Sequence, residues 1–354
     1  MDLDLLAKLC ETPGVPGREE RVRRLITKSI KGLFDEVRTD PMGSLICTRN
    51  PTTPSKPRKP TRVMIAAHMD EIGFYVRHVD DKGFVWINPA GGFDARNLFS
   101  RRVLVCCAGG DYEGVMNPSG KPLHISTPEE RKKVPETTEF FIDLGMDAKS
   151  VQKKVTIGDF VVMHEPFIEQ PRKVVSKALD NRVACFVAIE ATRILAKSRA
   201  KAAQHRCELV VVFTVQEEVG LRGATTAANS VGADIGIGLD TTLACDTPGI
   251  GETEWVSTHG KGVAIMVQDS SMIADHELVN DLCEVARTKK IPYQRCILPR
   301  GGQDAAAIQR AGSGARTAAI VCGTRYIHTV TESIDKKDLQ GAINLVAAWL
   351  PTVK

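Results

Sequence analysis

The sequence predicts an α/β fold in which helices cover both faces of a mostly parallel sheet. Four short segments are apolar on consecutive residues, as strands are when both faces of a parallel sheet are buried. Three further segments have the spacing of helices and lie between or after these strands. This alternation of strands and helices is typical of α/β domains. The predicted strands are residues 62–67, 209–215, 235–239 and 317–321, and the helical segments are 181–198, 275–290 and 335–349.

The first and the last predicted helices have further signals in the sequence. Residues 18–34 place Val22, Ile26 and Leu33 at helical spacing, which predicts an amphipathic first helix. The last helix is expected to begin at Asp335, whose side chain suits an N-cap position.

Residues 73–168 have a different sequence pattern from the rest of the chain. Short alternating segments are separated there by Gly, Pro and Asp, which predicts an inserted small β-barrel-like domain. Because 354 residues exceed the length at which single cores tend to divide, we expect two domains. The first is an α/β domain made of residues 1–72 and 169–354, and the second is the insertion.

The composition argues against nucleic acid and membrane partners. The net charge of +4 is spread along the chain, and no basic arm or helix gathers it. No uncharged apolar run approaches the ~18 residues of a membrane span. The ten cysteines include no C-x-x-C pair, which favours reduced thiols. We therefore expect a cytoplasmic protein with no nucleic acid and no membrane partner.

Ionisable residues stand where the predicted strands end. His68 follows the first strand, the pair Glu217 and Glu218 follows the second, Asp240 follows the third, and His328 comes shortly after the fourth. Carboxyl ends of parallel strands meet at one edge of a sheet, where α/β proteins bind their ligands. We expect one site at this edge.

Asp180 joins this group because it opens the helix predicted to start near residue 182. Taken singly, each residue has a structural explanation: Asp180 as a helix cap, Asp240 as the start of a turn, each histidine as a hydrogen-bonded buried residue. If these structural explanations were all correct, five ionisable residues would lie at matching positions of the fold by coincidence. Two histidines and three carboxylates without a cysteine suit zinc, cobalt or manganese.

Five candidate ligands are too many for one catalytic ion and suit two ions that share a carboxylate. We expect His68, Asp180 and Asp240 to bind one divalent metal ion. Asp180, Glu218 and His328 would bind the other, so that Asp180 bridges the pair.

The adjacent glutamates divide their roles. Successive side chains of a strand point to opposite faces, so Glu217 and Glu218 reach one site only if the chain bends where the strand ends. Glu218 is the expected ligand, and Glu217 is left as a general base for the water that bridges the two ions. A glutamate base beside two Lewis acids predicts hydrolysis of an amide.

Six ordered motifs resemble the glutamyl aminopeptidase-like family of co-catalytic metallopeptidases, which includes the tetrahedral aminopeptidases. The resemblance covers nearly the whole chain. The motifs are "AAHMDEIGF" (66–74), "KALDNRVA" (177–184), "VFTVQEEVGLRGA" (212–224), "GLDTT" with "DTPG" (238–249), "RGGQDAAAI" (300–308) and "RYIHTVTESI" (325–334).

The resemblance implies the same metal ligands and the same general base, and it adds Asp70 as a catalytic-site carboxylate that orients a histidine ligand. It also implies a cis peptide bond between Asp180 and Asn181. The β-rich insertion is similar to the dimerisation domain of the family, whose members commonly assemble from dimers into homo-oligomers of twelve subunits.

Three positions depart from the family pattern. Gln303 stands where relatives often have a small hydroxyl residue, Thr329 and Val330 stand where Ser-Pro is common, and Asn181 replaces a frequent Asp. The first two departures flank the expected substrate pocket, so substrate preference is less transferable than mechanism.

The sequence favours a di-metal aminopeptidase that removes the N-terminal residue of short peptides. An amidohydrolase or deacylase with the same metal centre, acting on a non-peptide amide, is the first alternative. A glycosidase is a second, although it leaves both histidines unexplained. A non-catalytic assembly protein stabilised by metal is the third.

Overall fold

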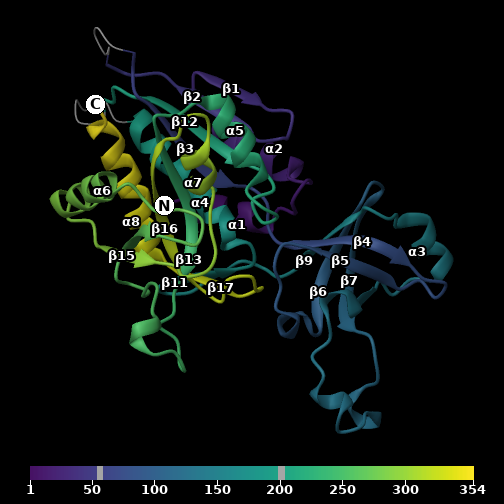
Figure 1. Ribbon diagram of the computed structural model, residues 1–354. Coiled ribbons are helices and arrows are strands. Elements are labelled where there is room, and N and C mark those ends of the chain that lie inside the picture. The colour runs from purple at the N-terminus through teal and green to yellow at the C-terminus, as the bar shows by residue number, and fades with distance from the viewer. Residues whose placement is uncertain (54–58, 198–203) are drawn as a thin grey trace.

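The computed structural model describes residues 1–53, 59–197 and 204–354 of the chain. These residues form two lobes (Figure 1), one built on an eleven-stranded sheet and the other on a closed six-stranded barrel. Among the described residues, no helix combines the length and the apolar character needed to cross a membrane.

The large sheet is parallel in its middle and antiparallel at its margins. Its order is β1-β2-β12-β3-β13-β16-β17-β11-β10, and β14 and β15 extend from β16. The parallel strands β12, β3, β13 and β16 are the four that the sequence predicts, which confirms the α/β prediction. The bounds are β1 Glu36–Thr39, β2 Leu45–Arg49, β3 Arg62–His68, β10 Ile168–Glu169, β11 Lys173–Ser176, β12 Glu208–Thr214, β13 Ile235–Leu243, β14 Val263–Gln268, β15 Tyr293–Ile297, β16 Arg316–Arg325 and β17 Glu332–Asp335.

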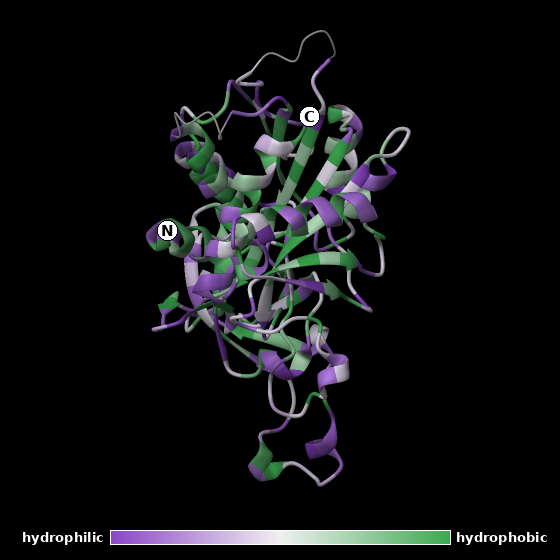
Figure 2. Ribbon diagram, turned by 90° about the vertical axis from the view of Figure 1, so that its left-hand side faces the viewer, coloured by the Kyte–Doolittle hydropathy of each residue, from purple (hydrophilic) through white to green (hydrophobic). Residues whose placement is uncertain are grey.

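Helices cover both faces of this sheet, as expected. Helices α1, α2, α4, α6 and α8 pack their apolar residues in one core with the sheet, and α5 and α7 pack on the other face. In Figure 2, strands with many hydrophobic residues lie between helices that also carry hydrophilic residues. The bounds are α1 Leu3–Glu11, α2 Glu20–Ser29, α4 Leu179–Lys197, α5 Arg222–Val231, α6 His276–Thr288, α7 Ala305–Arg310 and α8 Lys336–Trp349.

Several predicted elements have different ends in the structure. β13 and β16 continue past residues 239 and 321 because residues 240–243 pair with residues 321–324, so Asp240 lies within its strand. The helix predicted at 18–34 ends at Ser29, close to a left-handed Gly32 with φ of 78°. It is not the first helix, because α1 precedes it. Residue 198, the predicted end of the helix after Asp180, lies outside the described residues.

The second lobe is a closed barrel with the strand order β4-β5-β8-β7-β6-β9. All six strands fall within residues 73–168, where the sequence predicts the insertion. Their bounds are β4 Gly73–Val79, β5 Val85–Ala90, β6 Arg101–Cys107, β7 Gly110–Pro118, β8 Phe140–Asp143 and β9 Phe160–Met163, and the short helices η1 Ala95–Leu98 and α3 Ala148–Lys154 accompany them. The barrel core also takes in Val330, which comes from the loop after β16. The two lobes are therefore packed together through an apolar contact.

Asp335 caps α8, as predicted from the sequence. Its carboxylate accepts a hydrogen bond from the backbone N–H of Lys337 at 2.8 Å. Replacing Asp335 with alanine is expected to lower the free energy of unfolding by about 0.5–2 kcal/mol, because a helix N–H loses its partner. Urea unfolding followed by circular dichroism measures this change, and an unaltered midpoint would contradict the capping role.

Candidate active site

A cleft of about 820 Å³ lies at the carboxyl edge of the parallel strands and is bordered by both lobes. The sheet lobe supplies most of the wall, including the predicted metal ligands. The barrel lobe supplies Gly92, Phe93, Asp94 and Asn97. A second hollow of about 810 Å³ lies beside α6 and α8, but the described residues that line it include no histidine. The chemistry of the lining, and not its volume, distinguishes the first cleft.

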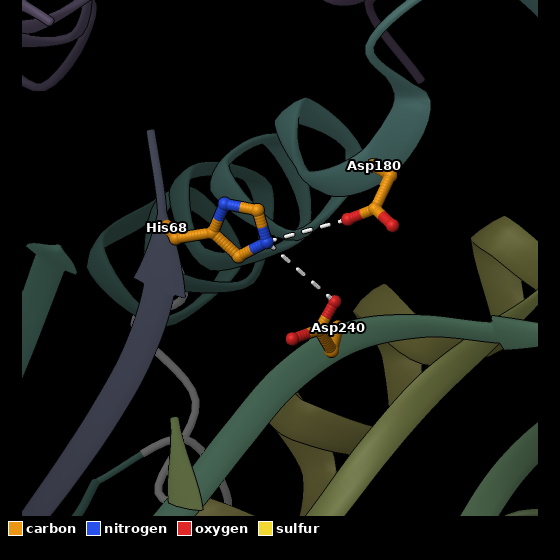
Figure 3. A group of neighbouring side chains, drawn as sticks. All are labelled: His68, Asp180 and Asp240. Atoms are coloured by element: carbon orange, nitrogen blue, oxygen red, sulfur yellow. Dashed lines mark ion pairs between the residues drawn. The ribbon is translucent and has the colours of Figure 1, made fainter. Parts of the chain in front are cut away.

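His68, Asp180 and Asp240 converge in this cleft from three different elements (Figure 3). The Nε2 atom of His68, at the end of β3, lies 3.3 Å from Asp180 Oδ1 and 3.9 Å from Asp240 Oδ1. One donor atom from each of the three residues lies within 4.8 Å of the other two. This is the first of the two ligand groups that the sequence predicts.

The second predicted group forms on the other side of Asp180. His328 Nε2 lies 3.5 Å from Asp180 Oδ2 and 3.4 Å from Glu218 Oε1. The two carboxylate oxygens of Asp180 thus face the two histidines, one each. Asp180 and Asn181 have non-helical backbone angles at the start of α4, and the peptide bond between them is cis, which confirms that expectation.

The bend required by the adjacent glutamates is present. β12 ends at Thr214, and Gln216 adopts a left-handed conformation with φ of 55°. Both acidic side chains then reach the cleft, and Glu217 Oε2 lies 3.7 Å from His68 Nε2. His68, Glu217 and Glu218 form a third group of close donor atoms, which the sequence does not predict.

Asp70 contacts two segments that carry predicted metal ligands. Its carboxylate lies 3.5 Å from His68 Nδ1, although that nitrogen is closer to the Asp70 carbonyl oxygen, at 3.0 Å. The same carboxylate accepts the backbone N–H groups of Glu217 and Glu218, each at 3.1 Å. Asp70 therefore contacts the loop that carries the glutamates as well as the histidine.

The cluster of buried and partly buried carboxylates favours a positive charge beside it. Burial raises the pKa of Glu217 and Asp240 well above its ordinary value, against the attraction of His68. Burial also acts to raise the pKa of Asp180, but hydrogen bonds with His328 and His68 lower it overall. For His328, burial acts to lower the pKa, yet Asp180 and Glu218 raise it to about 12. Crowded carboxylates thus stabilise any nearby cation.

The donor set fits divalent metal ions. Imidazole nitrogen and carboxylate oxygen are ligands that suit zinc, cobalt and manganese. The two predicted groups of three ligands share Asp180; His68 and Asp240 are buried, and Asp180, Glu218 and His328 are partly buried. Each group has the three protein ligands that a catalytic metal site uses.

Two other residues of the site were not singled out from the sequence. Glu332 is buried and accepts the backbone N–H groups of Asp180 and His328. Asp304 is buried, accepts a hydrogen bond from Thr214, and has its pKa raised by burial to about 6. An acidic residue within the short buried strand "ESID" was the available signal for Glu332.

The barrel also contacts a predicted ligand directly. His328 Nδ1 lies 2.9 Å from the carbonyl oxygen of Gly92, in the segment between β5 and η1. A neutral His328 that donates this hydrogen bond from Nδ1 leaves Nε2 free for a metal ion. No side-chain motif in the sequence could indicate a backbone carbonyl, so this contact was not predictable.

The departures from the family pattern are not among the residues that line the cleft. Gln303 is buried, donates to Asp269 at 3.2 Å and accepts from the N–H of Ala305 at 2.8 Å. Thr329 and Val330 border a much smaller cavity together with Glu332. Their side chains therefore support the cleft from behind.

The family match places this chain in a class of enzyme, the peptidases. The chain belongs to the M42 glutamyl aminopeptidase family, whose model matches residues 43–345. It is 30% identical to the lysyl aminopeptidase of Pyrococcus furiosus over 361 residues, which cover 100% of this chain and 98% of that protein.

Solved structures agree with this assignment. An aminopeptidase from the archaeon Desulfurococcus kamchatkensis matches with a TM-score of 0.91 and 34% identity, over 99% of this chain and 94% of that one. The TET1 peptidase of Pyrococcus horikoshii, which can assemble into a tetrahedron or a large octahedral shell, matches with a TM-score of 0.85 and 29% identity over 98% of each chain.

Proposed function

We propose that this protein is an aminopeptidase that uses two divalent metal ions to remove the N-terminal residue of short peptides. The observation that carries the proposal is the position of Asp180, whose carboxylate oxygens lie 3.3 Å from His68 Nε2 and 3.5 Å from His328 Nε2. Asp240 and Glu218 would complete the two ligand groups. Zinc or cobalt, with manganese as a further option, suits these donors.

Two bound ions would polarise the scissile carbonyl group and lower the pKa of an attacking water molecule. Glu217 is the general base in this proposal, because its carboxylate lies at the cleft and belongs to neither predicted ligand group. It takes a proton from the water and then gives it to the amine that leaves.

The proposed substrate has a free amino terminus. Asp180, Glu218 and Asp240 would be occupied as metal ligands, so one metal ion together with Glu217, which lines the cleft and belongs to neither predicted ligand group, would bind the α-amine. Asp70 keeps the two glutamates in place through their backbone N–H groups. A cleft of about 820 Å³ that is open to solvent suits a short peptide.

Blocking the amino terminus is expected to slow hydrolysis strongly. An aminoacyl anilide and its N-acetyl derivative should differ in kcat/KM by roughly 100-fold or more, because acetylation removes the free amine that the proposed site binds. The measurement is the release of the aniline chromophore by metal-loaded protein. Faster release of aniline from the acylated compound would favour an amidohydrolase instead, and release of acetate without aniline would favour a deacylase.

The proposal extends to assembly and location. The barrel is the proposed dimerisation domain, and a dodecamer built from dimers is the proposed homo-oligomer, consistent with the assemblies named for the TET1 peptidase. The cytoplasm is the proposed location, because the cysteine spacing favours reduced thiols.

A further inference from the structure

Glu332 connects two metal-ligand segments that lie far apart in the chain. One carboxylate oxygen, Oε2, accepts the backbone N–H of Asp180 at 2.9 Å, and the other, Oε1, accepts the backbone N–H of His328 at 2.8 Å. Glu332 begins β17 and pairs with Ser176 of β11, so its own backbone is fixed within the large sheet. Only 2% of the residue is exposed.

The two segments that Glu332 contacts are irregular and need such support. Asp180 has a non-helical conformation at the start of α4, and His328 is left-handed with φ of 63°. A non-glycine residue in that region is strained and persists only where its surroundings hold it. Glu332 therefore stabilises the backbone beneath both side chains.

Asp70 makes the same type of contact on the other side of the cleft. Its carboxylate accepts the adjacent N–H groups of Glu217 and Glu218. Each of these buried carboxylates thus uses two oxygens to fix two backbone amides. Glu332 differs because its two amides belong to the shared ligand and to the histidine of the second ligand group.

We propose that Glu332 is a positioning residue that holds Asp180 and His328 at the separation required to bind a metal ion together with Glu218. The inference rests on the metal-dependent function proposed above. Glu332 contacts the backbone of the ligands and is not itself a ligand in the two predicted groups. Residues that orient ligands in this way typically contribute roughly 10- to 100-fold to metal affinity.

Two substitutions test the contact. In Glu332→Gln the amide oxygen can accept one N–H, but the amide nitrogen then faces the other N–H group, so one segment must move. In Glu332→Asp the side chain is one methylene shorter and reaches one N–H at a time. We expect the Co²⁺ ion held by Asp180, Glu218 and His328, called the second ion, to bind roughly 10- to 100-fold more weakly to Glu332→Gln than to the wild type. Its affinity for Glu332→Asp should lie between these two.

Asp338→Asn is the matched control. Asp338 is also buried and accepts two backbone N–H groups, from Gly260 at 2.6 Å and from Gly262 at 2.8 Å, but it does not line the cleft. This variant loses the same kind of double contact elsewhere in the fold. We expect it to bind both Co²⁺ ions as the wild type does, even if its thermal stability falls.

The measurement is equilibrium dialysis of the full-length apoprotein against Co²⁺, with metal analysis and visible absorption spectra. Wild-type affinity for both ions in the folded Glu332→Gln variant would overturn the proposal, and so would equal loss of the second ion in Asp338→Asn. If Glu332→Gln does not fold, the Co²⁺ affinity of Glu332→Asp is measured in its place. A wild-type protein that binds fewer than two ions would instead contradict the two-metal function itself.

Discussion

Replacing Glu217 with glutamine is expected to lower kcat by about 100- to 10,000-fold while both metal ions and the fold are retained. Glutamine has nearly the same shape as glutamate but cannot take a proton from water. Glu217 lies 3.7 Å from His68 Nε2 and belongs to neither of the groups built on Asp180. Steady-state kinetics with an aminoacyl anilide and metal analysis of the same preparation provide the two readings.

Glu218→Gln is the matched control for this experiment. It changes the neighbouring residue in the same chemical way, but Glu218 is one of three donors in the group with Asp180 and His328. We expect this variant to lose metal as well as activity. If Glu217→Gln also loses a metal ion, the group formed by His68, Glu217 and Glu218 binds metal and the general base is a different residue. If its kcat stays within tenfold of wild type, the base assignment is wrong.

The central sheet and the site edge were predictable because buried parallel strands leave a clear pattern. Their residues are apolar in succession, and their carboxyl ends align, so ionisable residues placed there come together. His68 and Glu218 illustrate this rule. Asp240 follows it only in part, since it lies inside β13 and reaches the cleft from within the strand.

Helices with small buried residues escaped prediction. The inner face of α5 is formed by Ala224, Ala227 and Ala228, and α7 buries Ala305–Ala307 with Ile308. Alanine contributes little to hydrophobic periodicity, so neither segment stands out in the sequence. Both helices pack against the sheet on the face opposite α4, and the close approach that alanine allows is visible only in three dimensions.

Contacts between the lobes could not be predicted from the sequence either. The carbonyl group of Gly92 meets His328, and Val330 enters the barrel core only two residues further along. A loop that follows β16 is thereby fixed by a domain inserted some 240 residues earlier in the chain. Backbone acceptors and packing across lobes depend on how the chain folds back, which spacing along the sequence does not encode.

Substituting Asp180 with alanine is expected to remove both metal ions and reduce peptidase activity to background. Each predicted ligand group includes Asp180, and without it the pairs His68 with Asp240 and Glu218 with His328 have only two ligands each. A catalytic ion of this kind generally requires three protein ligands. The apoprotein should still fold, because the backbone N–H of residue 180 can still donate to Glu332, although the side-chain contacts with His68 and His328 are lost.

Comparison with two single-group variants makes the test of Asp180 specific. Asp240→Ala leaves the group of Asp180, Glu218 and His328 intact, and His328→Ala leaves that of His68, Asp180 and Asp240. Each should therefore retain one tightly bound ion per subunit, whereas Asp180→Ala retains none. Native mass spectrometry of metal-loaded protein counts these ions directly. One tightly held ion in Asp180→Ala would mean either that the two metal sites do not share this carboxylate or that the group of His68, Glu217 and Glu218 binds an ion by itself.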